Sequence, residues 1–251
     1  MSEQVPRIYA DADALARAAA DELMRLAQAS VAARGLFTLA LSGGSTPKKL
    51  YSLLATDPVF RAIPWDKSHL FFGDERHVPP DHADSNYRMV RESLLVAGIV
   101  PEGHVHRMHA EIPDSAQAAA DYDEEMRKFF TGDLRLDGFP RFDLVLLGMG
   151  PDGHTASLFP DSPGLKETAR WVIANPVEKF KTDRITFTFP VLNAARTVLL
   201  LVAGQDKTEM IKQVLGPKPV EPPYPVQRVQ PAHGEKIWLL DKAAAAGLSA
   251  S

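Results

Sequence analysis

Apolar residues recur along the chain in two alternating patterns, one typical of amphipathic helices and one typical of buried strands. Between 11 and 34, apolar side chains three and four positions apart, from Leu15 to Val31, predict a helix that ends at Gly35. The run 36–41 that follows is almost continuously apolar, which indicates a buried strand. Helix and strand therefore follow one another from the start of the chain.

The same alternation continues toward the end of the chain. Short apolar runs predict further strands at 69–72, 142–147, 171–174, 184–189, 197–202 and 236–240. Helices are predicted at 48–55, with Pro47 at the first helical position, at 85–97, 115–130 and 207–215, and in the alanine-rich tail from Ala243. Strands that alternate with helices favour right-handed crossovers. We therefore expect an α/β fold with a doubly wound, mostly parallel sheet and helices on both faces.

The length of 251 residues suits a single catalytic domain over 1–251. Within it, 216–231 is rich in proline and has few apolar anchors. This composition predicts a connecting segment or a lid rather than a helix or strand.

The composition excludes several classes of protein. The chain has no cysteine, so disulfides, thiolate zinc sites, iron–sulfur clusters and a cysteine nucleophile are ruled out. The net charge of -4 argues against general nucleic-acid binding, and an anionic substrate needs a local positive pocket. No apolar run reaches the roughly 18 residues of a membrane span, and 1–10 lacks the basic and apolar regions of a signal peptide. We expect a cytoplasmic protein that binds neither nucleic acid nor a membrane.

A glycine- and hydroxyl-rich loop, Ser42-Gly43-Gly44-Ser45-Thr46, lies between a predicted strand and a predicted helix. Free backbone N–H groups and the positive end of the helix dipole favour an anion at such a place, and hydroxyls add hydrogen bonds. A phosphate monoester fits this chemistry. The loop lacks the Gly-Lys-Ser/Thr of a nucleotide P-loop and the spacing of dinucleotide sites, and a tight turn with an N-cap is the alternative.

A second polar loop, Gly73-Asp74-Glu75-Arg76-His77, follows the predicted strand 69–72. Strand ends in such folds face a shared crevice, where an arginine can hold an oxyanion and a carboxylate can orient an imidazole. A solvated loop with an internal ion pair is the alternative.

The third stretch, Gly148 to Ser157, follows the predicted strand 142–147 and carries His154. Glycines after an apolar run, followed by Thr-Ala-Ser-Leu-Phe, predict a strand, a tight turn and a helix start. An isolated histidine is more often satisfied by a local hydrogen bond than used in chemistry. Two polar loops on parallel strands reverse this preference and make His154 the candidate catalytic residue.

The remaining histidines form a looser pattern. His104, His106 and His109 are close in sequence, but they lie in a predicted loop without a clear carboxylate partner. Ligand spacing without geometry is weak evidence, so we predict no metal site there.

Four motifs resemble one family in their order along the chain. They are Leu-Ser-Gly-Gly-Ser-Thr-Pro at 41–47, Gly-Asp-Glu-Arg-His-Val-Pro at 73–79, Asp-Ser-Asn-Tyr-Arg at 84–88 and Gly-Met-Gly-Pro-Asp-Gly-His-Thr-Ala-Ser-Leu-Phe-Pro at 148–160. Together they resemble the 6-phosphogluconolactonase family. The resemblance implies hydrolysis of 6-phospho-D-glucono-1,5-lactone to 6-phospho-D-gluconate in the oxidative pentose phosphate pathway, without metal or organic cofactor. It also implies the fold shared with sugar-phosphate isomerases and glucosamine-6-phosphate deaminases.

The resemblance also assigns roles to residues. It implies that Gly43, Gly44, Ser45, Thr46, Arg184 and Lys207 hold the substrate phosphate. The mechanism we expect has neutral His154 removing a proton from water, with Arg76 stabilising the oxyanion. Asp74 either orients the histidine or binds sugar hydroxyls.

Two alternatives stay open. A glucosamine-6-phosphate deaminase or aldose–ketose isomerase would need a carboxylate base, which Asp74 or Glu75 could supply. Deaminases characteristically have Ile-Ala-Phe-Asn after the histidine, whereas this chain has Thr155-Ala156-Ser157-Leu158. A non-catalytic sugar-phosphate sensor is the other alternative, but no DNA-binding motif is visible.

Overall fold

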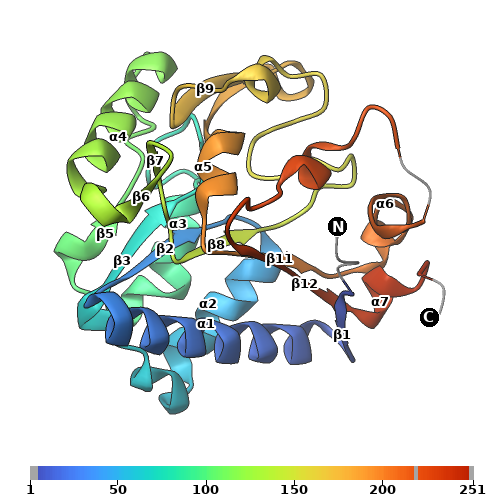
Figure 1. Cartoon of the computed structure of the whole chain (residues 1–251), viewed down its shortest axis with the longest axis horizontal. Coiled ribbons are helices and arrows are strands. Elements are labelled where there is room, and N and C mark those ends of the chain that lie inside the picture. The colour runs from blue at the N-terminus through green and yellow to red at the C-terminus, as the bar shows by residue number, and fades with distance from the viewer. Residues whose placement is uncertain (1–4, 218–219, 249–251) are drawn as a thin grey trace.

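A parallel sheet of seven strands forms the centre of the computed structural model, which describes residues 5–217 and 220–248 (Figure 1). The strand order is β1-β12-β11-β8-β2-β3-β5, and each neighbouring pair is parallel. The strands are β1 (Arg7–Tyr9), β2 (Phe37–Leu41), β3 (Ser68–Phe72), β5 (Val105–His106), β8 (Leu144–Leu147), β11 (Thr197–Val202) and β12 (Glu235–Asp241). The predicted doubly wound α/β fold is confirmed.

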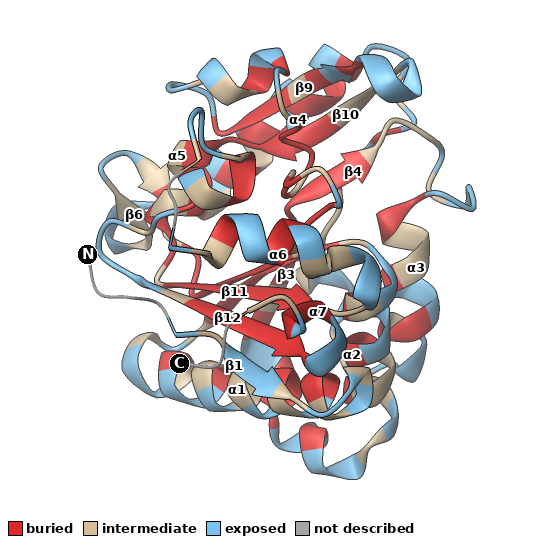
Figure 2. Cartoon of the chain, turned by 90° about the vertical axis from the view of Figure 1, so that its right-hand side faces the viewer, coloured by how far each residue is buried: buried red, intermediate tan, exposed pale blue. Residues whose placement is uncertain are grey.

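Helices cover both faces of this sheet. The first helix, α1 (Ala12–Arg34), lies below the sheet in Figure 1 with α2 (Ser45–Thr56), and α5 (Phe189–Ala194) lies above it. Figure 2 shows α6 (Thr208–Leu215) over β11 and β12, on the face opposite α1. Every residue of β2, β8 and β11 is buried, as expected for strands covered on both sides.

Local capping sets both ends of α1, and the end at Gly35 is the one that the sequence predicts. The Asp11 carboxylate accepts the backbone N–H groups of Asp13 and Ala14, at 3.0 and 2.9 Å, and satisfies two donors of the first turn. Gly35 ends the helix in the left-handed conformation, with φ of 80°.

A second, antiparallel sheet corrects the prediction for two strands. Its order is β4 (Asp74–Arg76), β10 (Thr182–Phe187) and β9 (Val172–Val177), so the predicted strands 171–174 and 184–189 lie outside the parallel sheet. The physical reason is the short connection 178–181, since parallel neighbours need a crossover of about a dozen residues or more. The 15-residue helix α4 (Ser115–Phe129) packs against this small sheet (Figure 2).

Several boundaries differ from those expected. Helix α2 begins at Ser45, so Pro47 is its third residue, not its first. Helix α3 (Asn86–Ser93) ends early, and a 3₁₀ turn, Leu95–Ala97, completes the predicted range. The remaining described β-strands are β6 (Arg135–Leu136) and β7 (Phe139–Pro140), which pair with each other. The remaining described α-helix is the short α7 (Lys242–Ala245).

The predicted helix start after His154 is wrong. Residues 155–158 form an isolated antiparallel bridge, and Ala156 has φ of 47°, which a right-handed helix does not allow. The Thr155 hydroxyl donates to the Gly148 carbonyl at 2.8 Å, so the chain folds back on itself instead of entering a helix.

The proline-rich segment is partly built into the core. Residues 225–228 form a 3₁₀ turn, and the side chains of Val226 and Val229 are fully buried. Residues 218–219 of this segment, and 249–251 of the predicted tail helix, lie outside the described residues.

Within residues 5–217 and 220–248, every helix is too short or too polar to cross a membrane.

The histidines of the predicted loop pack at the β3–β5 edge of the sheet. His106 Nδ1 lies 2.7 Å from the Glu125 carboxylate, and His106 Nε2 lies 3.2 Å from His69 Nδ1. The His69 ring stacks on His104 with centroids 4.1 Å apart. Burial, and the nearby His104 and His106, lower the pKa of His69 to about 4. His69 is therefore neutral in the folded protein at pH values where the unfolded chain binds a proton.

This arrangement predicts loss of stability in mild acid. The pKa of His69 is about 4 in the folded chain and about 6.5 when unperturbed, so the unfolded chain binds a proton more readily. The packing of neutral His69 therefore contributes fully to the free energy of unfolding above pH 6.5, and this contribution is lost as pH falls toward 4. His69→Phe keeps an aromatic ring but removes the titration. We expect the difference between urea midpoints at pH 7 and pH 5 to be smaller in His69→Phe than in wild type. His233→Phe, at an exposed position, is the control, and an unchanged difference in His69→Phe contradicts the prediction.

Candidate active site

A cavity of about 320 Å³ lies where the direction of chain progress through the sheet reverses. From β2 the chain passes through α2 to β3 on one side, whereas from β8 it returns to the sheet at β11 on the other side. The carboxyl ends of β2 and β8 are adjacent, because Leu39 pairs with Leu144 and Ala40 with Val145. Ligands bind at such switch points in open α/β sheets. The walls of the cavity are formed by 42–47, Asp74, Arg76, Asn86, 148–151, 154–157, Phe159, Phe180, Arg184, 201–203 and Lys207.

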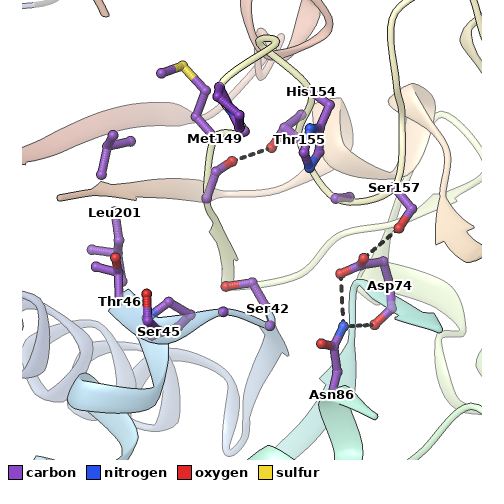
Figure 3. Close-up of a pocket in the computed structure, with 18 of the residues that line it drawn as sticks. Ser42, Ser45, Thr46, Asp74, Asn86, Met149, His154, Thr155, Ser157 and Leu201 are labelled. Carbon is purple, nitrogen blue, oxygen red and sulfur yellow. Dashed lines mark hydrogen bonds between the residues drawn. The ribbon is translucent and has the colours of Figure 1, made fainter. Parts of the chain in front are cut away.

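The residues to which the sequence analysis gives a catalytic or phosphate-binding role in the expected lactonase all line this one cavity: Gly43, Gly44, Ser45, Thr46, Asp74, Arg76, His154, Arg184 and Lys207. They come from five separate stretches of chain. Figure 3 shows Ser45 and Thr46 on one side of the cavity and His154 on another. The topology, and not nearness in sequence, brings them together.

One end of the cavity is the N-terminus of α2. Gly44 is the N-cap, with φ of 108°, and no side chain caps the helix. Ser45 and Thr46 are the first two helical residues, so their N–H groups and hydroxyls stand at the positive end of the helix dipole. This end of the cavity suits an anion with several acceptor oxygens.

Three cations line the cavity. Arg184 on β10 pairs in register with Arg76 on β4, so two guanidinium groups are neighbours across the small sheet. Nε and Nη1 of Arg184 are buried and lack a hydrogen-bond partner among the described residues. Burial, and secondarily the charge of Arg76, lower the pKa of Arg184. Lys207, the third cation, precedes α6 and lies 3.0 Å from the Asp206 carboxylate.

Like charges held together and partly dehydrated are unfavourable unless an anion compensates them. The cavity therefore concentrates positive charge locally, on a chain whose net charge is -4.

Asp74 is buried and held by two neighbours. The Ser157 hydroxyl donates to Asp74 Oδ2 at 2.6 Å, and Asn86 Nδ2 donates to the Asp74 carbonyl at 2.9 Å (Figure 3). Only 8 % of Asp74 is exposed. The Asp74 carboxylate accepts this hydrogen bond from Ser157, and no hydrogen bond links the carboxylate to His154 in the described part of the chain.

Glu75, the neighbouring carboxylate, points into a different environment. It accepts the backbone N–H groups of Asn86 and Tyr87, at 2.7 and 2.8 Å, and the Ser85 hydroxyl at 3.0 Å. Burial raises the pKa of Glu75, and these backbone hydrogen bonds oppose the shift. Glu75 thus anchors the first turn of α3 and is not among the cavity-lining residues.

His154 lies at the end of a tight turn after β8. The Gly150 N–H donates to the His154 carbonyl at 2.9 Å, and the Gly153 N–H donates to the Gly150 carbonyl at 3.1 Å. A Cβ on Gly150 would lie 2.0 Å from Cε1 and Nδ1 of the His154 ring. Glycine at this position is therefore what lets the imidazole lie against the turn.

Asp152 is the carboxylate partner of His154, a role that sequence reasoning missed. His154 Nδ1 lies 2.5 Å from Asp152 Oδ1. The hydrogen bond from His154 lowers the pKa of Asp152 to about 2, so Asp152 is ionised at neutral pH. We assign the His154 proton to Nδ1, because only that tautomer donates to the carboxylate. The available signal was the Asp-Gly-His spacing, which places the two side chains on one turn.

Aromatic rings border the histidine. The Phe159 ring stacks on His154 with centroids 4.1 Å apart, and the Phe180 ring meets Phe159 edge-on at 5.8 Å. Phe159, Phe180, Asn86 and Ser157 also line the cavity, although the sequence analysis assigns no site role to them. An apolar wall and a few placed polar groups are typical of small-molecule sites.

The described residues contain no group of three or more His, Cys, Asp or Glu side chains arranged to hold a metal ion. The cluster of His69, His104 and His106 lies at the sheet edge, away from the residues that line the cavity.

A parallel sheet with a cationic, hydroxyl-rich pocket at its switch point, beside a histidine–carboxylate pair, is the arrangement of an α/β protein that binds a small anionic molecule. The family model for glucosamine-6-phosphate isomerases/6-phosphogluconolactonase matches residues 10–238. The chain belongs to this family.

Relatives within the family agree with one another. The chain is 44% identical over 219 residues to a 6-phosphogluconolactonase of Synechocystis sp., covering 87% of this chain and 88% of the relative. It is 41% identical over 242 residues to a 6-phosphogluconolactonase of Nostoc sp., covering 96% and 97%. The solved structure of 6-phosphogluconolactonase from Trypanosoma cruzi is similar over 100% of this chain and 99% of that chain, with a TM-score of 0.87 and 31% identity.

The solved structure of a monomeric glucosamine-6-phosphate deaminase is similar in fold over 96% of this chain and 99% of that chain, with a TM-score of 0.75. The sequence identity is only 17%. This likeness extends to the architecture alone.

The close contact at Gly150 predicts the effect of adding one methyl group. Gly150→Ala forces the His154 ring away from the turn, because its Cβ would overlap the imidazole at 2.0 Å. We expect the ring to lose its contact with Asp152, which nitrogen NMR spectra of the histidine side chains can detect. Gly103→Ala is the control, since nothing lies within 4 Å of the added Cβ. An unshifted His154 signal in Gly150→Ala contradicts the prediction.

Proposed function

We propose that the chain hydrolyses 6-phospho-D-glucono-1,5-lactone to 6-phospho-D-gluconate. The observation that carries the proposal is the pairing, in one cavity, of a cationic anion-binding end with the Asp152–His154 pair. The names of the relatives support the choice of substrate.

The 6-phosphate occupies the end formed by the N-terminus of α2. Backbone N–H groups of the loop from Gly43 to Thr46, and the hydroxyls of Ser45 and Thr46, donate to its oxygens. Arg184 and Lys207 supply the charge that a phosphate dianion requires. The guanidinium nitrogens Nε and Nη1 of Arg184 support this role, because they are buried donors with no acceptor among the residues that the structure describes.

His154 acts as the general base. With its proton on Nδ1 held by Asp152, the Nε2 lone pair is free to accept a proton from water. The oxygen of that water forms a bond to the lactone carbonyl carbon, giving a tetrahedral oxyanion. The imidazolium then returns the proton to the ring oxygen as the carbon–oxygen bond of the ring breaks, leaving a carboxylic acid that ionises and a free hydroxyl.

Arg76 and Asp74 act on the substrate from the small sheet. One Arg76 nitrogen donates to the Asp84 carbonyl, which orients the guanidinium at the cavity wall, where it stabilises the oxyanion. Asp74 accepts hydrogen bonds from sugar hydroxyls, since Asp152 already occupies Nδ1 of the histidine.

The alternative as a deaminase or isomerase loses one of its two candidate bases. Glu75 caps the first turn of α3 and does not line the cavity, which leaves Asp74 alone. Release of ammonia from glucosamine 6-phosphate, assayed beside lactone hydrolysis, decides between the two reactions. The lactonase assay is corrected for spontaneous hydrolysis.

Removing the base or its partner lowers turnover. Because general-base catalysis contributes about 10²–10⁴-fold, we expect His154→Ala to lower kcat by that range with KM nearly unchanged. Asp152→Asn frees His154 to adopt the other tautomer, so kcat falls at least about tenfold. Steady-state kinetics check both variants, with exposed Asp133→Asn as the control. Near wild-type kcat in His154→Ala would falsify the base assignment.

Removing a phosphate-binding cation weakens substrate binding. A charge-assisted hydrogen bond contributes roughly 1.5–3 kcal/mol, so Arg184→Ala or Lys207→Ala raises KM by about 10- to 150-fold. We expect a smaller effect on kcat, because the phosphate is remote from the reacting carbonyl. Lys128→Ala removes an exposed positive charge on α4 and controls for net charge. An unchanged KM removes the residue concerned from the phosphate site.

A further inference from the structure

The proline-rich segment contacts the turn that carries His154 at residues that do not line the cavity. Tyr224 and Val226 contact Gly153, the residue immediately before His154. The Val226 N–H donates to the Gly153 carbonyl at 3.0 Å. Neither Tyr224 nor Val226 lines the cavity.

The Tyr224 side chain fits closely against the backbone of Gly153. A Cβ on Gly153 would lie 2.8 Å from Cδ1 and Cγ of Tyr224 and 2.9 Å from its Cβ. Gly153 also has φ of 76°, a conformation that glycine adopts readily. The peptide before His154 is therefore held on two sides, by the Tyr224 ring and by the Val226 N–H.

The segment that makes these contacts is itself anchored. Val226 and Val229 are fully buried in the hydrophobic core. The Tyr224 N–H donates to Gln227 Oε1 at 2.9 Å, and Gln227 Nε2 donates to the Val214 carbonyl on α6 at 3.1 Å. The Tyr224 hydroxyl donates to the Gln213 side chain, also on α6.

Helix α6 begins at Thr208, directly after Lys207. Lys207 lines the cavity at its cationic end, whereas the last turns of α6 hold Tyr224 and Gln227. A continuous set of packed residues thus joins the phosphate-binding end of the cavity to the turn that carries His154.

We infer that Tyr224 is a positioning residue: its ring, clamped between α6 and Gly153, holds the His154 turn at a set distance from the phosphate site. The inference rests on the proposed role of His154 as the base. Misplacement of a catalytic group by about 1 Å costs roughly 10²-fold in rate, so a small shift of this turn has a measurable effect.

The test compares Tyr224→Ala with Tyr224→Phe in the full chain. We expect Tyr224→Ala to lower kcat at least about tenfold while KM changes less than about threefold, because the phosphate contacts are intact. Tyr224→Phe keeps the ring against Gly153 and loses only the hydroxyl hydrogen bond to Gln213, so it is expected to restore most of kcat. Tyr9→Ala, which removes a partly buried ring on the edge strand β1, controls for a general loss of stability.

A double variant separates positioning from a purely structural role. If Tyr224 acts through His154, Tyr224→Ala adds no further loss of kcat in a His154→Ala background. An additional loss there, or a wild-type kcat in Tyr224→Ala alone, overturns the inference. If Tyr224→Ala does not fold, Tyr224→Leu carries the same test, since it keeps the segment apolar but presents no ring to Gly153.

The same assay keeps the two proposals apart. Full activity in His154→Ala overturns the general-base role whatever Tyr224 does. An inactive His154→Ala together with a fully active Tyr224→Ala overturns only the positioning role.

Discussion

Burial of the parallel sheet on both faces is the constraint on which the rest of the molecule depends. Strands β2, β8 and β11 are buried at every residue, so polar chemistry cannot lie along them and must lie at their ends. The reversal between β2 and β8 opens a crevice at one such end, and the cavity occupies it. The small sheet borders this crevice, because Asp74 and Arg76 on β4 and Arg184 on β10 line the cavity.

This geometry gathers positive charge at the cavity. A chain with a net charge of -4 attracts an anion only through a local field, and the cavity supplies one by placing Arg76 and Arg184 side by side across a strand pair. The N-terminus of α2 adds a dipole that carries no side-chain charge. Both arginines lie on the small sheet, whereas α2 follows β2 of the large sheet. The two sheets must therefore keep their relative placement for these groups to face one anion.

The turn that carries His154 shows how backbone geometry controls a side chain. Gly150 leaves room for the His154 ring, Asp152 holds its Nδ1, and Phe159 stacks on its face. Each contact is local in sequence and confines the ring, but local contacts do not fix where the turn lies relative to the N-terminus of α2. That placement comes from residues near 224, some seventy positions later in the chain, which pack against Gly153.

The sequence by itself determined the alternation of strands and helices, the end of α1 at Gly35, and the residue types at the strand ends, since these depend on local periodicity and turn chemistry. It also indicated His154 and the loop from Gly43 to Thr46. Tertiary structure decided the rest. Strands β9 and β10 pair antiparallel with β4 instead of entering the parallel sheet, Glu75 turns to α3 while Asp74 faces the cavity, and Tyr224 meets Gly153. These outcomes depend on contacts between distant segments, which no local pattern encodes.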